Sequence, residues 1–126
     1  MEDPVDEVLA ERKSEMAEKL LESLMKTIGD LDGLVQGLLT TLPPAKPWQR
    51  QLRKQLSEID RHIEVLRLTI SLERDHSEIL QAALVAHRAL QLANGTLAGG
   101  RADGNTRAAL QVSERLASMI CAFLTP

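Results

Sequence analysis

The sequence predicts an all-α protein: a long antiparallel helical hairpin of coiled-coil type with a third, C-terminal helix. Apolar residues recur in alternating steps of three and four on both sides of the Pro-rich segment 43–47, which is the spacing of one helix face. Aromatic residues make up only 2% of the 126-residue chain, so its core must be aliphatic, which favours packed helices over sheets. We therefore expect one helical domain, residues 1–126, that forms a three-helix bundle or part of a larger helical bundle.

The first helix is predicted over residues 5–42. Pro4 precedes it at a position where a helix tolerates proline, because the first N–H groups of a helix have no partner within it. The predicted core face of this helix consists of Leu21, Leu24, Ile28, Leu31, Val35, Leu38 and Leu42.

Three glycines fall on the outer faces of this helix, at Gly29, Gly33 and Gly37. In a helix they would cost about 3 kcal/mol of propensity relative to alanine. Two interpretations stay open. The strip is either a second close-packing face, where another helix backbone approaches, or a loosened and kinked last third of the helix.

The Pro-rich turn 43–47 leads into a second helix, predicted over residues 47–94. Pro47 suits a first turn, and Asn94 followed by Gly95 suits a helix end. Such a helix would be roughly 70 Å long. We interpret the polar residues Glu73 and Ser77 on its core face as a weak zone that faces a similar zone of the first helix. The predicted core face of the second helix consists of Leu52, Leu56, Ile59, Ile63, Leu66 and Ile70.

Residues 95–105 are a flexible Gly-rich loop by composition, and a third helix is predicted over 106–124 after an Asn105 cap. This helix would be roughly 28 Å long, whereas a second apolar stripe on the long helix would run roughly 42 Å. The third helix therefore leaves one end of that stripe uncovered. We predict that this end binds a protein partner; it consists of Val65, Leu68 and Leu72.

A basic cluster stands at the start of the second helix, where the helix dipole is already positive. The facing stretch of the first helix, residues 33–42, contains no acidic residue. These charges are therefore expected to be uncompensated within the hairpin. They form either a solvated surface patch, the favoured interpretation, or a site for an acidic partner segment, a phosphate or an anionic lipid head group. The predicted partner-binding residues here are Trp48, Arg50, Arg53 and Lys54.

Charge and cysteine content restrict the class of protein further. Residues 1–42 hold ten acidic and four basic residues, a net charge of −6, and residues 46–126 hold eight acidic and eleven basic residues, a net charge of +3. This balance argues against nucleic-acid binding. The single cysteine excludes an internal disulfide, and no stretch approaches the ~18 apolar residues of a membrane span. We expect a cytoplasmic protein without membrane contact.

Patterns that carry catalysis are missing from the sequence. Glu73 and His76 form one Glu-x-x-His pair, whereas di-metal carboxylate bundles need two such pairs and two further glutamates. Cys121 lies on an apolar helix face without a nearby base, so it is expected to pack as a small hydrophobe. We expect no catalytic residue, no cofactor and no metal.

The sequence thus predicts a non-enzymatic protein-binding module. It would act as an assembly subunit or adaptor that contributes a coiled-coil hairpin to a larger complex or to a homo-oligomer, possible homodimers included. The alternative is a helical chaperone of the bacterial secretion or export type, which would hold a helical segment of a client protein. The partner in either case is a protein that binds through helix packing.

Overall fold

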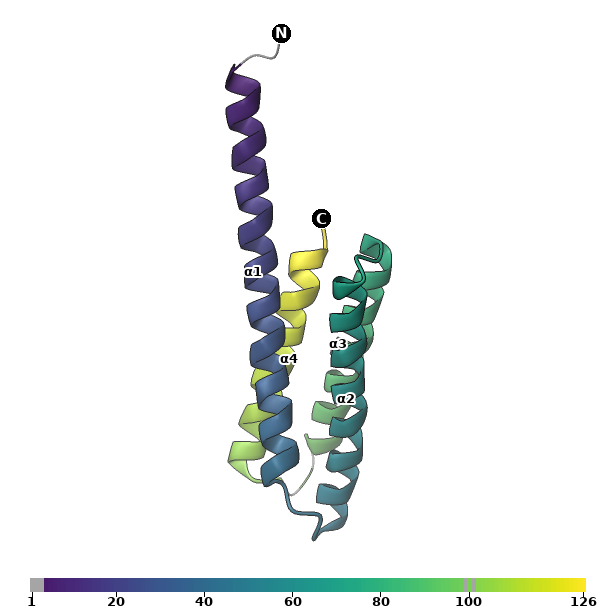
Figure 1. The fold of residues 1–126 in the computed structure, drawn as a ribbon. Coiled ribbons are helices and arrows are strands. Elements are labelled where there is room, and N and C mark those ends of the chain that lie inside the picture. Colours follow the sequence, from purple (N-terminus) through teal and green to yellow (C-terminus); the bar gives the residue numbers. More distant parts are fainter. Residues whose placement is uncertain (1–3, 99, 101) are drawn as a thin grey trace.

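The computed structural model describes residues 4–98, 100 and 102–126. It is all-helical, as predicted, but it contains four helices where the sequence predicted three (Figure 1). These are α1 (Pro4–Thr41), α2 (Pro47–Ser71), α3 (His76–Leu97) and α4 (Gly104–Leu124). The expected hairpin with one long second arm is therefore wrong.

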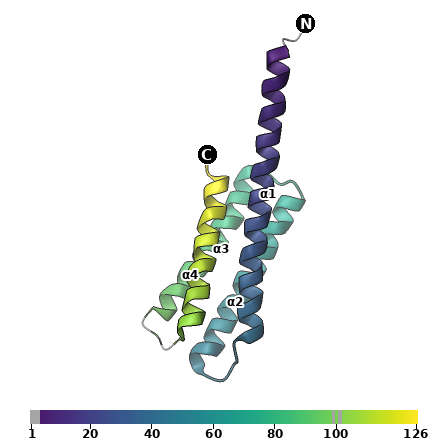
Figure 2. The ribbon, with the colours of Figure 1, turned by 90° about the vertical axis from the view of Figure 1, so that its left-hand side faces the viewer.

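The helices form an up-down-up-down bundle. Each helix contacts its chain neighbours, α1 with α2, α2 with α3 and α3 with α4, and α4 closes the ring against α1 (Figures 1 and 2). Within the described residues no Cα atoms of the diagonal helices, α1 with α3 or α2 with α4, come within 8 Å of each other. Short connections between consecutive helices favour this antiparallel order.

The predicted helix 47–94 breaks at residues 72–75. Glu73 takes a left-handed conformation with φ 52°. The Arg74 N–H donates to the Thr69 carbonyl at 3.0 Å, and the Glu73 N–H donates to the Ile70 carbonyl at 3.0 Å. These two bonds are those of a Schellman motif, which ends a helix by satisfying its last carbonyl groups. The position that glycine usually occupies in this motif is held here by Glu73.

The start of α3 follows immediately. Asp75 is the N-cap residue of α3 and has an extended backbone. Its carboxylate accepts a hydrogen bond from the Glu78 N–H at 2.9 Å. The Ser77 hydroxyl donates to the same carboxylate at 3.0 Å. An aspartate followed three residues later by a glutamate is a sequence signature of a helix start, so the polar residues interpreted as a weak zone in one helix belong to a turn between two.

The predicted core faces of α1 and α2 are buried, with two exceptions. Leu21 is 51% exposed, and Ile70 is half-buried at the margin of the core. The remaining members do not form a two-helix seam, because α3 and α4 complete the core. Small residues are prominent among the buried positions of these two helices, which lets them pack closely; they include Ala83, Ala86, Ala93, Ser113 and Ala117.

Polar contacts join neighbouring helices outside the core. The Gln36 amide donates to Asp60 at 2.6 Å between α1 and α2, and Asp32 pairs with Arg67 at 3.2 Å. Between α3 and α4, the Asn94 amide donates to the Glu114 carboxylate at 2.6 Å. Such contacts support the antiparallel arrangement but contribute little each, since most are partly exposed.

The connection before α4 is shorter than predicted. Helix α3 continues to Leu97, and α4 begins at Gly104 with Asp103 as its cap in place of Asn105. The Asp103 carboxylate accepts the Thr106 N–H at 2.8 Å. Residues 99 and 101 of the predicted loop 95–105 lie outside the described residues.

The first half of α1 projects beyond the bundle. Every residue from 4 to 23 is exposed, and the buried positions of α1 begin at Leu24. Figures 1 and 2 show this segment rising past the end of the bundle where α2 connects to α3. We call residues 4–23 the α1 extension.

The glycine strip does not break α1, which is continuous from Pro4 to Thr41. A Cβ atom placed on Gly29, Gly33 or Gly37 would meet no atom within 4 Å. The described part of the chain therefore neither kinks at these glycines nor packs another helix against them.

Candidate helix-binding groove

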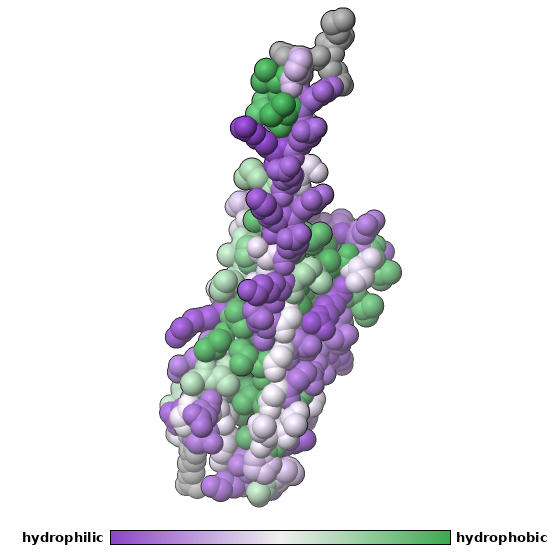
Figure 3. Space-filling view, turned by 60° about the vertical axis from the view of Figure 1, so that its left-hand side comes forward, coloured by the Kyte–Doolittle hydropathy of each residue, from purple (hydrophilic) through white to green (hydrophobic). Residues whose placement is uncertain are grey.

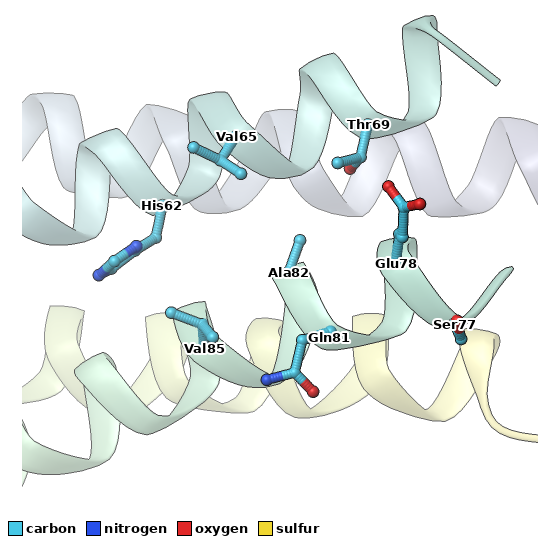
Figure 4. A pocket seen from close by; sticks show the side chains of 8 residues that line it. All are labelled: His62, Val65, Thr69, Ser77, Glu78, Gln81, Ala82 and Val85. Carbon is cyan, nitrogen blue, oxygen red and sulfur yellow. The ribbon is translucent and has the colours of Figure 1, made fainter. Parts of the chain in front are cut away.

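A groove runs between α2 and α3 on the face of these helices turned away from α1 and α4 (Figure 4). Its larger section is a hollow of about 620 Å³, and a second section of about 330 Å³ continues it towards the far end of α3. His62 and Val85 line both sections, so the two hollows are adjacent along the same pair of helices. We call this surface the α2–α3 groove.

Helix periodicity builds the two walls. The α2 wall has steps of three and four, and consists of Gln55, Glu58, His62, Val65 and Thr69. The α3 wall follows the same rule, and includes Glu78, Ala82, Val85, Ala89 and Leu92. Because Ala82 and Ala89 have short side chains, the helices leave a hollow between them. From Gln55 to Thr69 the groove is about 21 Å long.

The three apolar residues predicted to bind a partner are all exposed. Val65 lines the groove and is 45% exposed, while Leu68 and Leu72 lie on the adjacent outer surface of α2 and are 57% and 68% exposed. At the other end of the groove Leu92 is 70% exposed. Val65, Leu68 and Leu72 thus form an exposed apolar strip at helical spacing on α2, and its role in binding stays a prediction.

Charged side chains stand along the groove margins. Glu58 lies on the α2 side, and Glu78 and Arg88 lie on the α3 side. Glu78 also pairs with Arg74 at 2.8 Å across one helical turn. An apolar floor between polar margins is the usual form of a site that receives one face of an amphipathic helix.

The basic cluster lies at the end of the bundle where α1 connects to α2, opposite the α2–α3 connection (Figure 1). Arg53 donates from Nη1 to the carbonyl oxygens of Leu39 and Leu42, at 2.7 and 2.6 Å. Arg50 donates to the carbonyl oxygens of Pro44 and Ala45, at 3.3 and 3.0 Å. Both arginines thus bond carbonyl groups at the end of α1 and in the turn. Neither pairs with a carboxylate among the described residues, so the binding of an acidic partner here stays a prediction.

The other two predicted members of the cluster differ from each other. Trp48 is half-buried against the core, and its Nε1 is buried without a hydrogen-bond partner among the described residues. Lys54 is exposed. The sequence grouped the four residues by their position at the start of α2 and by the lack of facing acidic residues. In the structure Trp48 packs against the core, and Arg50 and Arg53 bond backbone carbonyls.

No cluster of three or more His, Cys, Asp or Glu residues within the described part of the chain could hold a metal ion. Burial raises the pKa of the Cys121 thiol, which lowers its thiolate content. The Glu78 N–H and then the Ser77 hydroxyl lower the pKa of the Asp75 carboxyl. The same effect at Asp103 comes from the Thr106 hydroxyl and N–H. Both shifts belong to helix caps.

Sequence reasoning missed the α3 wall of the groove. Val85 and Leu92 lie outside the stripes that it identified, although their spacing from Ala82 and Ala89 follows the same steps of three and four. That spacing was readable, but only the break at residues 72–75 turns α3 back beside α2 and makes the two walls face each other.

None of the four helices, over the residues described, has both the length and the apolar character that a membrane crossing needs. No known protein family, curated protein or solved structure matches this chain.

Proposed function

We propose that this protein is a non-enzymatic helix-binding module, an assembly subunit or adaptor that receives an amphipathic helix in the α2–α3 groove. The observation that carries the proposal is the groove itself, which is apolar along its floor, about 21 Å long and flanked by the exposed strip of Val65, Leu68 and Leu72. Exposed apolar surfaces of this kind mark protein interaction sites in soluble proteins.

The dimensions favour a helix as the bound element. About 14 residues of helix span 21 Å. Two anchors seven residues apart, about 10.5 Å along a helix, would meet the groove beside Val85 and beside Leu92. Ala82 and Ala89 leave room for larger side chains from the partner. The partner would therefore carry an apolar face on an otherwise polar helix.

A chaperone of the secretion or export type is the second candidate. The groove is open to the surface along its length, which suits a client helix that is held and then released. An assembly subunit would keep its partner in a stable complex, whereas a chaperone would exchange it. The two functions are separated by the lifetime of the complex, measured by competition with unlabelled partner.

Photo-crosslinking from the groove tests the proposal. A photoreactive residue at Gln81, which lines the groove and is exposed, should crosslink a discrete polypeptide in extracts of the source cells. A matched probe at Thr40, exposed on α1, should not. Val65→Asp should abolish the Gln81 crosslink while far-UV circular dichroism stays unchanged. Equal crosslinking from both probes, or none from Gln81, would contradict a binding role for the groove.

A further inference from the structure

The α1 extension carries an apolar stripe that the bundle does not cover. Val5, Leu9, Met16 and Leu20 recur at helical spacing along one side of it, and all four are exposed, Met16 to 64%. Figure 3 shows apolar surface at the tip of the extension. Helices in soluble proteins owe most of their stability to packing of an apolar face. The extension would therefore be stabilised by a surface that buries this stripe.

The extension matches the α2–α3 groove in length. From Val5 to Leu20 the stripe runs about 22 Å, and the groove from Gln55 to Thr69 runs about 21 Å. The groove has an apolar floor, and the extension has an apolar stripe of similar length, with mostly charged residues on its other faces apart from Val8 and Leu21. A stripe of this length would cover the floor of the groove from Gln55 to Thr69.

Charges at the margins agree with this pairing. The stripe is flanked by Arg12, Lys13 and Lys19. Carboxylates stand on both walls of the groove, at Glu58 and Glu78, and the α3 wall also holds one cation, Arg88. A helix laid in the groove would bring cations near these carboxylates, which favours register and orientation more than affinity.

The extension cannot reach the groove of its own chain. It continues α1 in a straight line away from the bundle, and α1 contacts α2 and α4 on the side opposite the groove (Figures 1 and 2). The covering groove must therefore belong to another molecule.

We propose that the occupant is the α1 extension of a second copy of this chain, which rests on the groove being a helix-binding site as proposed above. The extension leaves the bundle at the end where α2 connects to α3, and the larger section of the groove begins at that same end. A second copy can be related to the first by a two-fold axis perpendicular to the helices at this end of the bundle. Its extension would then lie along the first copy's groove, and the first copy's extension would lie in its groove. The contact is then two-fold and closed, the commonest form of homodimer.

Pairing of the two extensions with each other fits less well. The stripe is symmetric about residues 12 and 13, since Val5 would face Leu20 and Leu9 would face Met16 in an antiparallel pair. That register places Arg12 and Lys13 of both copies together at the centre, and like charges there would oppose association. The groove offers carboxylates instead.

The test is the association state of the full chain, measured by sedimentation equilibrium and light scattering. The wild type should be a dimer. Met16→Asp in the extension and Val65→Asp in the groove should each raise the dimer dissociation constant by about 30-fold or more, the size of a hot-spot loss. Leu92→Asp, at an exposed groove position, repeats the groove test should Val65→Asp perturb folding. The matched control is Val112→Asp, on an exposed part of α4, which should leave the dimer intact.

Mixing supplies the decisive measurement. Met16→Asp keeps an intact groove and Val65→Asp keeps an intact extension, so an equimolar mixture should recover a heterodimer through one complete site. A wild-type monomer at about 100 µM, a dimer lost only in Met16→Asp, or a mixture that stays monomeric would each overturn the proposal. A crosslink from Gln81 to an unrelated protein in a monomeric wild type would keep the groove's binding function and reject the second copy as its occupant.

Discussion

Replacing the three outer glycines of α1 by alanine should stabilise the protein, and the structure supplies the magnitude. Gly29, Gly33 and Gly37 lie inside a continuous helix, are exposed, and would meet no atom within 4 Å if a Cβ were added. Steric cost is therefore absent and only the backbone entropy of glycine is removed. Each substitution is worth about 0.8–1.0 kcal/mol in a helix interior, so the triple variant should gain about 2.5–3 kcal/mol of unfolding free energy.

Urea unfolding followed by far-UV circular dichroism measures this gain. The midpoint should rise while the urea dependence stays unchanged, since the buried surface is the same. The reverse substitution Ala108→Gly, at an exposed position within α4, serves as the matched control and should lose about 1 kcal/mol. A triple variant stabilised by less than about 0.5 kcal/mol would refute a continuous, uncovered helix at these glycines, because a kink or a packed partner would then require them.

Four further outcomes are expected. Ile63→Ala, at a fully buried position, should cost about 2–5 kcal/mol in urea unfolding. Glu73→Gly should stabilise by about 1 kcal/mol, because glycine adopts the left-handed conformation of that residue without strain; no gain would contradict the Schellman end of α2. Arg53→Met should cost about 1–2 kcal/mol through the lost bonds to carbonyl groups, and an unchanged melt would show them to be unimportant. Because hydrogen bonds lower the pKa of Asp75 and Asp103 in the folded state, the stability they supply is present above about pH 4 and is lost as pH falls through the folded-state values. The drop in urea midpoint on acidification should be smaller in the Asp75→Asn/Asp103→Asn double variant, and an equal drop would assign acid sensitivity to other groups.

The break at residues 72–75 shows where periodicity misleads. Apolar spacing continues across the break, and neither glycine nor proline marks it, so a single helix was the natural prediction. The local signal lay instead in Asp75 and Glu78, a cap and its third residue. The turn requires a left-handed conformation of Glu73, which costs conformational free energy in a residue other than glycine. Packing of α3 against both α2 and α4 offsets that cost.

The basic cluster shows a different limit. Counting charges along facing stretches found no acidic partner for Arg50 and Arg53. Backbone carbonyl groups are acceptors that no residue count includes, and the end of α1 provides them to Arg53. Whether a side chain is free can be judged only once the nearby backbone has a position.

The sequence by itself determined the helical class and the buried faces of α1 and α2, because steps of three and four place apolar side chains on one side of a helix whatever its neighbours are. It also contained the caps that begin α3 and α4. Only the tertiary structure decided that four helices form the bundle, that Val65 and Val85 line one groove, and that the α1 extension stands uncovered. These depend on where a chain turns back and which helices become neighbours, and such long-range choices follow from the packing of the whole core.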